Sequence, residues 1–473
     1  MDSTQFRKEA HKLADWMADY FEQVEDYPVK PEVQPGDIIQ QLPESPPDSG
    51  ESFDKIFKDF QQVIMPGMTH WESPSFMGYF PANKSYPSVL AEMLTATLGA
   101  QCMSWVTSPA ATELEERVME WLRDMIGLPA HFSGVIQDTA STSTLAALLM
   151  AREQATDFEV NKAGFSSRRP LAVYCSSETH SSIEKDVKIA GFGHKYLRKI
   201  PVNSDFSINI QALEKKIQAD LKQGIEPTCV VATLGTTGST AVDSLPEIAD
   251  ICRRYDIFLH VDAAYAGTAL LLPEHRTMIE GIEQVNSFVF NPHKWMFTNF
   301  DCSAFFVRDQ SLLVRTFEIM PEYLKTAEDK RVRNYRDWGI QLGRRFRALK
   351  LWFVIRDFGV KGLQEKIRLH IKLAQDLEQA IRQAPNFELL APVPFNLLCF
   401  RYHPAHLSDE KKLNRLNKTL LEQINKTGEL FITHTKLSGR YTLRMVIGNT
   451  HVEQRHVEQA WNVISEQAAK LRE

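Results

Sequence analysis

Residues 257 to 267 read IFLHVDAAYAG. The first five are apolar apart from one histidine and are rich in branched and aromatic side chains, which predicts a buried strand. Asp262 ends this strand, and a carboxylate there requires a partner because an unpaired buried charge is strongly unfavourable. An ordinary helix N-cap explains the aspartate equally well, since two alanines follow it.

Similar short apolar runs lie on both sides of this stretch, with helical patterns between them. The predicted strands cover residues 171–175, 229–234, 257–261, 288–290 and 304–307. The predicted helices cover residues 181–190, 210–222 and 245–255. Strands that alternate with helices along a chain predict an α/β fold with a mostly parallel, doubly wound sheet.

The pattern of the chain changes twice, which predicts three domains. Residues 1–84 form an N-terminal helical segment that contains the Pro-rich stretch 28–47. This segment is too small for a good core of its own and is expected to pack on another surface, such as a partner subunit. Residues 85–360 make a large α/β domain, and residues 361–473 make a smaller α+β domain.

Composition excludes several classes of function. The chain has 473 residues, of which 43% are hydrophobic and 24% charged, as is usual for soluble globular proteins. Its net charge of −6 offers no basic field for nucleic acid or anionic lipid. No apolar run approaches the ~18 residues of a membrane span, and the N-terminus lacks the apolar core of a signal peptide. Six scattered cysteines without a CxxC pair predict no metal site, no disulfides and a cytoplasmic location.

The sequence NPHKW (291–295) follows a predicted strand and contains Lys294. A lysine at the carboxyl end of a sheet strand faces the crevice where α/β proteins bind ligands. When its amine is partly desolvated, such a lysine can form a Schiff base with an aldehyde cofactor. A lone lysine on a loop is more often a surface residue, so the assignment depends on the neighbouring motifs.

Two further motifs favour a ligand site. The sequence TAST (139–142) opens a predicted helix, and free N–H groups with short hydroxyls at a helix start can bind an anion. Taken alone, these residues are explained by simple helix capping. His180 follows another predicted strand, so it can reach the same crevice and lie on a flat ring, although a single histidine is usually a core or surface residue.

The strings HVDAAYAG (260–267) and NPHKW (291–295) resemble the pyridoxal-phosphate (PLP)-dependent group II decarboxylases, specifically the aromatic L-amino acid decarboxylases. Further matching segments are MPGMTHW (65–71), SWVTSPAATEL (104–114), VATLGTT (231–237), NFDCSA (299–304) and LGRRFRALKLWFVIR (342–356). The segment VIQDTASTSTL (135–145) most resembles bacterial members. The resemblance implies PLP fold type I, PLP as the cofactor, and a homodimer with active sites at the subunit interface.

The resemblance also implies roles for individual residues. Lys294 matches the Schiff-base lysine, Asp262 the partner of the pyridine nitrogen, and His180 the histidine that stacks on the ring. Tyr323 matches a tyrosine on a mobile loop and is the expected proton donor to Cα, with His180 assisting. The remaining cofactor positions are Thr139, Ala140, Ser141, Thr237, Ala264, Asn291 and His293.

Matches to the substrate pocket predict an aromatic substrate and leave its identity open. The aromatic positions are Trp71, Tyr79, Phe80 and Phe300. Ala82 replaces a threonine of animal dopa decarboxylases, and Gln101 and Met103 replace larger apolar residues that reach the partner's site. Gly343 stands where close relatives among histidine decarboxylases carry serine, which favours larger side chains.

Three alternatives compete with decarboxylation of aromatic L-amino acids to amines and CO₂. An aldehyde synthase of the same family replaces the loop tyrosine by phenylalanine or the stacking histidine by asparagine, so Tyr323 and His180 disfavour it. Gly343 disfavours a histidine decarboxylase. A catalytically silent PLP-binding or scaffold protein is disfavoured because Lys294, Asp262, His180 and Tyr323 are all present.

Overall fold

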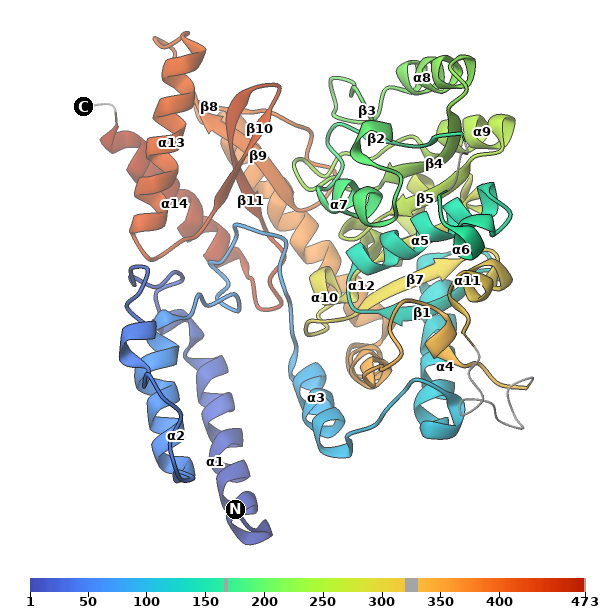
Figure 1. Ribbon diagram of the computed structural model, residues 1–473. Coiled ribbons are helices and arrows are strands. Elements are labelled where there is room, and N and C mark those ends of the chain that lie inside the picture. Colours follow the sequence, from blue (N-terminus) through green and yellow to red (C-terminus); the bar gives the residue numbers. More distant parts are fainter. Residues whose placement is uncertain (166–168, 320–330, 472–473) are drawn as a thin grey trace. The chain divides into compact units, whose positions relative to one another are not determined.

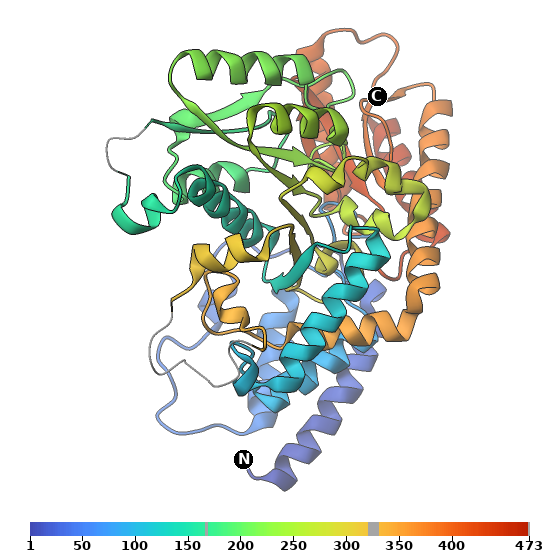
Figure 2. The ribbon, with the colours of Figure 1, turned by 90° about the vertical axis from the view of Figure 1, so that its right-hand side faces the viewer.

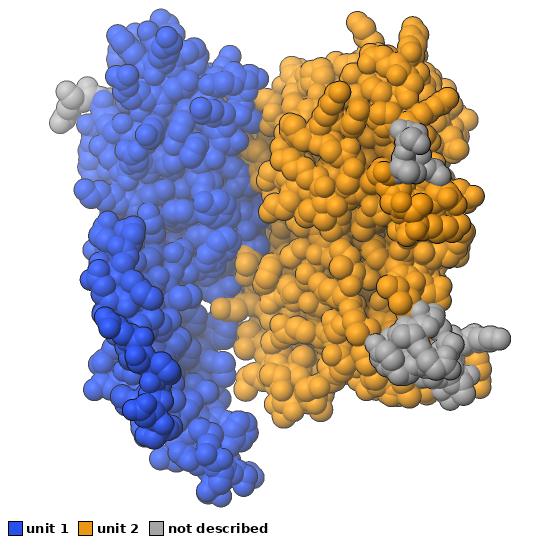
Figure 3. Space-filling view, in the orientation of Figure 1, with its two compact units in different colours: residues 1–81, 379–388, 400–473 blue, residues 82–378, 389–399 orange. Residues whose placement is uncertain are grey.

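The computed structural model describes residues 1–165, 169–319 and 331–471 and contains two compact units (Figure 3). Unit 1 comprises residues 1–81, 379–388 and 400–473, and unit 2 comprises residues 82–378 and 389–399. Each unit combines segments that are far apart in the sequence, whereas the predicted domains are three consecutive stretches. The predicted division at 84/85 and 360/361 stays a prediction.

Unit 2 contains a seven-stranded sheet with the order β1-β7-β6-β5-β4-β2-β3 (Figure 1). Its strands are β1 (Ser133–Gln137), β2 (Leu171–Ser176), β3 (Leu197–Ile200), β4 (Glu226–Thr233), β5 (Phe258–Asp262), β6 (Ser287–Phe290) and β7 (Ser303–Val307). β7 is antiparallel to both of its neighbours, and the other adjacent pairs are parallel. This arrangement confirms the predicted α/β class with a mostly parallel sheet.

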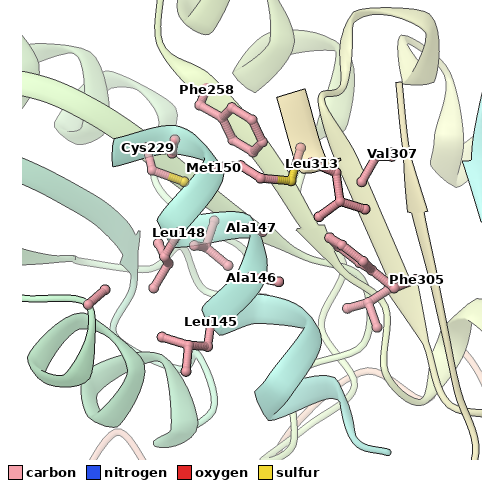
Figure 4. Close-up of a cluster of buried hydrophobic side chains, with 14 of the residues drawn as sticks. Leu145, Ala146, Ala147, Leu148, Met150, Cys229, Phe258, Phe305, Val307 and Leu313 are labelled. Carbon is pink, nitrogen blue, oxygen red and sulfur yellow. The ribbon is translucent and has the colours of Figure 1, made fainter. Parts of the chain in front are cut away.

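Helices cover both faces of this sheet (Figures 1 and 2). The helices of unit 2 are α3 (Tyr86–Leu98), α4 (Pro109–Ile126), α5 (Ala140–Ala155), α6 (Glu159–Ala163), α7 (Ser182–Ile189), α8 (Ile210–Lys222), α9 (Leu245–Tyr255), α10 (Pro292–Trp295) and α11 (Gln310–Phe317). On one face, residues 145–148 of α5 belong to a buried apolar cluster that also contains Phe258 and Phe305 (Figure 4). On the other face, Tyr174 of β2 donates a hydrogen bond to Asp220 of α8 at 2.9 Å. Alternating strand residues therefore contact opposite helical layers.

The smaller sheet has the order β10-β11-β9-β8. Its strands are β8 (Phe387–Leu389), β9 (Leu397–Tyr402), β10 (Thr433–Leu437) and β11 (Arg440–Val446). The helices of unit 1 are α1 (Ser3–Glu22), α2 (Phe53–Asp59), α13 (Glu410–Lys426) and α14 (Gln454–Lys470). α12 (Arg347–Gln383) is interrupted at Gly359, whose φ of 64° is non-helical.

The N-terminal segment packs against the C-terminal part of its own chain within unit 1. The Met77 N–H donates to the Phe431 carbonyl at 2.9 Å, and the Val446 N–H donates to the Met77 carbonyl at 2.8 Å. These bonds supply part of the surface that residues 1–84 were expected to need. Whether the segment also contacts a partner subunit stays a prediction.

Two predictions made from the composition concern the cysteines and the lengths of the apolar segments. All six cysteines are free and buried, as expected for reduced thiols. No helix in the described ranges is long and apolar enough to cross a membrane. The cytoplasmic location stays a prediction.

Candidate active site

Five loops that carry predicted cofactor residues leave one edge of the unit 2 sheet. The parallel strands β1, β2, β4, β5 and β6 all end at this edge. Thr139 follows β1, His180 follows β2, Thr237 follows β4, Asp262 ends β5, and Asn291 and Lys294 follow β6. Ligands of α/β proteins bind at such an edge, outside the carboxyl ends of the strands.

The start of α5 presents unpaired donors. Thr139 is the N-cap residue in an extended conformation, and the Ser143 hydroxyl donates to its carbonyl at 3.1 Å. The backbone N–H groups of Ala140 and Ser141 have no acceptor within the described part of the chain. Because these groups lie at the positive end of a 16-residue helix, they form a suitable site for a phosphate group.

Asn291 supplies a second polar group without a partner. Its side chain is only 2% exposed, and its amide oxygen accepts no hydrogen bond from any described residue. Its backbone is fixed, because its N–H donates to the Ala264 carbonyl at 3.0 Å and its carbonyl accepts from the Lys294 N–H at 2.9 Å. A buried amide oxygen that accepts no hydrogen bond destabilises the folded protein, unless a ligand donates a hydrogen bond to it.

Asp262 is buried, with 5% of its surface exposed. One carboxylate oxygen accepts from the Ala264 N–H at 3.0 Å, and no hydrogen bond to the other oxygen is found among the described residues. The carboxylate therefore has one oxygen available for a ligand.

Glycine is required at position 267, in the turn that follows Asp262. A Cβ on Gly267 would lie 2.4 Å from the Phe290 Cβ, so only glycine lets this turn pack against the end of β6.

The His180 ring remains exposed and is held by Ser182. Its Nδ1 accepts from the Ser182 N–H at 3.2 Å and lies 2.8 Å from the Ser182 hydroxyl. Because a backbone N–H can only donate, the proton of the neutral ring is on Nε2. Partial desolvation and then the positive charge of Lys294 lower the pKa of His180, while Asp262 raises it. The histidine is thus neutral near neutral pH and lies within electrostatic range of both charges.

The backbone of Lys294 is anchored by Asn83, whose side-chain amide donates to the Lys294 carbonyl at 2.7 Å. The neighbouring His293 is 4% exposed, and its Nδ1 accepts from the Cys302 N–H at 2.9 Å. Burial and then the Lys294 charge lower the pKa of His293 to about 3. The His293 ring also lies 4.7 Å from the ring of Phe300, which is 58% exposed. His293 therefore fixes the loop that carries a predicted pocket residue.

Several predicted pocket residues belong to unit 1, whereas Lys294 belongs to unit 2. The rings of Trp71 and Tyr79 stack with centroids 5.7 Å apart, and the Arg444 guanidinium lies 4.7 Å from the Phe80 ring. Their role beside the cofactor stays a prediction. Tyr323 lies outside the described residues.

The other pocket predictions fall in unit 2. Gln101 Oε1 accepts from the Arg344 N–H at 2.7 Å, and a Cβ on Gly343 would lie 3.3 Å from Gln101 Nε2. The Met103 carbonyl accepts from the Arg336 N–H at 2.8 Å. Gln101 and Gly343 are thus neighbours in one chain, while their contribution to a partner's site stays a prediction. Ala82, Ala264 and Thr237 are at least partly accessible.

The sequence motifs assigned no role to three buried polar residues near the ends of the strands. Thr144, His260 and Ser287 form a buried hydrogen-bonded chain across three elements. His260 stands two residues before Asp262, and this spacing of two in a strand places both side chains on one face of the sheet. That spacing is the signal that could have identified it.

These features fit PLP. The α5 N-terminus can hold a phosphate, Asp262 can hold a protonated ring nitrogen, and Lys294 can attach an aldehyde. The exposed His180 ring offers a flat surface for an aromatic ring. Among the residues that the structure describes, no group of three or more His, Cys, Asp or Glu could hold a metal ion.

Comparisons with known proteins support the same interpretation. A family profile described as "Pyridoxal-dependent decarboxylase conserved domain" matches residues 35–403. A phenylacetaldehyde synthase of Arabidopsis thaliana is 44% identical, over 100% of this chain and 97% of its own. The crystal structure of Catharanthus roseus tryptophan decarboxylase in complex with L-tryptophan has a TM-score of 0.94 and 40% identity, covering 100% of this chain and 99% of that one.

A second crystal structure, Oryza sativa TDC with PLP and tryptamine, has a TM-score of 0.96 and 37% identity. It also covers 100% of this chain and 99% of its own. These whole-chain matches confirm the predicted PLP fold type I. All three of these relatives are plant proteins, so they do not support the closer likeness to bacterial members that residues 135–145 suggested.

Proposed function

Because the chain belongs to the pyridoxal-dependent decarboxylase family, we propose that it converts aromatic L-amino acids into the corresponding amines and CO₂. Its cofactor is PLP. The observation that carries the proposal is a set of groups at one sheet edge that have no partner among the described residues: the N–H groups of Ala140 and Ser141, the Asn291 amide oxygen and one Asp262 oxygen. Related structures that contain L-tryptophan and tryptamine support an aromatic substrate.

Four kinds of group would hold the cofactor. The free N–H groups at the start of α5 would bind the phosphate, with the Asn291 side-chain N–H2 as a further donor, and the Lys294 amine would provide the covalent anchor. Asp262 would keep the ring nitrogen protonated through its available oxygen. When bound, the pyridinium ring supplies an electron sink for the electrons of the breaking Cα–carboxylate bond.

The residues of this chain would then control a single proton. After CO₂ leaves, Cα needs a proton to give the amine, and we assign Tyr323 as the donor. The neutral His180 carries its proton on Nε2, so it can assist by donating a hydrogen bond to a nearby group. Its lowered pKa supports this role, since a charged imidazole beside Lys294 would be repelled.

The pocket assignments support a ring-bearing substrate. Phe300 is exposed on a loop that His293 and Asp301 fix in place. The Asp301 carboxylate accepts two hydrogen bonds from Arg347, at 2.9 and 3.1 Å. Gly343 has no side chain, and the nearest atom to its missing Cβ is the Gln101 amide. The exposed Phe300 ring is thus assigned to one wall of the pocket, whereas Gln101 occupies the position that a side chain at 343 would take.

An aromatic aldehyde synthase is the second candidate, because the Arabidopsis relative carries that name. Tyr323 and His180 favour the decarboxylase, by the resemblance described above. The test is to supply the purified PLP-loaded protein with L-Trp, L-Tyr, L-Phe, L-Dopa and L-His, and to quantify CO₂, amine, aldehyde and peroxide. We expect one amine for each CO₂ from an aromatic substrate. Equal amounts of aldehyde, peroxide and CO₂ would assign the synthase, and activity on L-His alone would assign a histidine decarboxylase.

We also infer that two chains associate, because α3 exposes apolar side chains at helical spacing. These are Tyr86, Leu90, Met93, Leu94 and Leu98. An apolar patch of this kind usually marks an interaction surface, and the family resemblance implies a homodimer. Light scattering should give twice the chain mass of 54.0 kDa, whereas the mass of one chain would contradict the dimer.

A further inference from the structure

His260 is fully buried and is hydrogen bonded on both sides. Its Nε2 lies 3.1 Å from the Thr144 hydroxyl, and its Nδ1 lies 2.9 Å from the Ser287 hydroxyl. Both hydroxyl-bearing residues are also buried, with 1% and 0% of their surfaces exposed. The three side chains therefore form a continuous polar chain inside an otherwise apolar layer.

Each member of this chain belongs to a different element that carries a cofactor residue. Thr144 lies in the first turns of α5, just after the proposed phosphate site. His260 shares β5 with Asp262 and projects from the same face. Ser287 begins β6, the strand that leads into Asn291. The chain thus ties together the elements that would hold the phosphate, the ring nitrogen and the covalent anchor.

The charge state of His260 suits this position. Burial lowers its pKa to about 4, although the nearby Asp262 raises it. The neutral imidazole has one donor and one acceptor nitrogen, which match two hydroxyls, since a hydroxyl can either donate or accept. A protonated imidazole would instead place a positive charge beside Asp262 and compete with the ring nitrogen for its carboxylate.

A second hydrogen bond holds the same helix to another strand. The Ser143 hydroxyl lies 3.3 Å from the Ser303 hydroxyl of β7. Among the side-chain hydrogen bonds of the described residues of α5, however, those to His260 reach the strand of Asp262 and, through Ser287, the strand before Lys294. The chain through His260 therefore adds polar links between α5, β5 and β6 to the apolar packing of these elements.

We propose that His260 is a positioning residue, whose neutral ring holds α5, β5 and β6 at the spacing that PLP requires. The inference rests on the proposed function, because it assumes that PLP binds at this sheet edge. His260 itself does not touch the reacting atoms in this account. Its effect passes through Asp262 and through the phosphate site.

The test compares His260→Phe and His260→Gln by titrating each apoprotein with PLP and measuring its dissociation constant. Phenylalanine leaves two buried hydroxyls without partners, so the dissociation constant should rise about tenfold or more. Glutamine keeps one donor and one acceptor, so it should stay within about threefold of the wild type. In His260→Phe, kcat should fall while KM for the amino acid changes by less than about twofold.

Tyr174→Phe is the matched control, because it removes another buried hydrogen bond on the opposite face of the sheet. It should lower the free energy of unfolding without changing PLP affinity. If His260→Phe does not fold, Thr144→Val and Ser287→Ala each remove one link and should weaken PLP binding. Unchanged PLP affinity in the folded variants would overturn the inference alone, whereas a wild type that does not bind PLP would overturn the proposed function.

Discussion

The rings of Tyr265 and Trp295 stack with centroids 5.0 Å apart and planes 9° from parallel. Tyr265 lies three residues after Asp262, and Trp295 directly follows Lys294. The indole N–H of Trp295 also donates to Nδ1 of the buried His370 at 2.9 Å. The two motifs that carry the central charges of the site are therefore packed directly on each other.

Removal of this contact should loosen both motifs. Trp295 is fully buried, so Trp295→Ala should lower the free energy of unfolding by about 3–5 kcal/mol. Trp295→Phe keeps an aromatic ring and should cost less. Denaturant unfolding of the apoprotein measures both values, and equal stability of the two variants would contradict a role for the stacked ring.

Replacement of Asp262 should affect the rate far more than the fold. Asp262→Ala removes the charge that keeps the ring nitrogen protonated, so kcat should fall at least about a hundredfold. Asp250→Ala, on the exposed surface of α9, is the control and should keep the wild-type rate. A near-normal rate in Asp262→Ala would show that the electron sink is maintained in another way.

Asp186 should make stability depend on pH. Its carboxylate is 3% exposed and has one oxygen without a hydrogen-bond partner among the described residues. Burial, and then the charge of Asp262, raise the pKa of Asp186 from 3.8 to about 7. Between these two pH values the folded protein keeps this proton, whereas the unfolded chain has lost it. The free energy of unfolding therefore falls as the pH rises through this window.

Asp186→Asn cannot ionise and should escape this loss. Its free energy of unfolding should increase relative to wild type as pH rises through that window, by roughly 3–5 kcal/mol, and the difference should then stay constant. Urea unfolding at several pH values measures this difference. The same difference on both sides of the window would show that Asp186 does not titrate as described.

The loop tyrosine should decide the fate of the reaction. Without the Tyr323 hydroxyl, the Cα position would receive its proton more slowly, so reaction with oxygen would compete. Tyr323→Phe should therefore form aldehyde, ammonia and peroxide where the wild type forms amine. Oxygen uptake and product analysis measure the change, and a variant that still yields only amine at a normal rate would remove Tyr323 as the donor.

Much of the fold could be predicted from the sequence, because strands buried on both sides appear as short apolar runs. The run at 257–261 matches β5 (Phe258–Asp262) within one residue at each end. β1 and β3 were not predicted, since SGVIQ and LRKI are short and partly polar. The grouping of residues 1–81 with residues 400–473 also escaped prediction, because contacts between distant segments leave no local pattern.

The common location of the candidate site residues could be predicted where a motif contained them. Thr139, His180, Asp262 and Lys294 follow parallel strands, and the structure places those strand ends at one edge. The network of His260 could not be predicted, since its hydroxyl partners lie 116 and 27 residues away in the sequence. Such partners become neighbours only through the order of the strands.

The most direct test of the central claim is to locate the covalent attachment of the cofactor. The PLP-loaded protein would be reduced with borohydride, digested and mapped by mass spectrometry, with Lys294→Ala as the control. We predict a pyridoxyl group on the wild-type peptide that contains Lys294. The Lys294→Ala variant should show neither this modification nor the visible absorbance of bound PLP. A pyridoxyl group on another lysine, or full absorbance and turnover in Lys294→Ala, would contradict it.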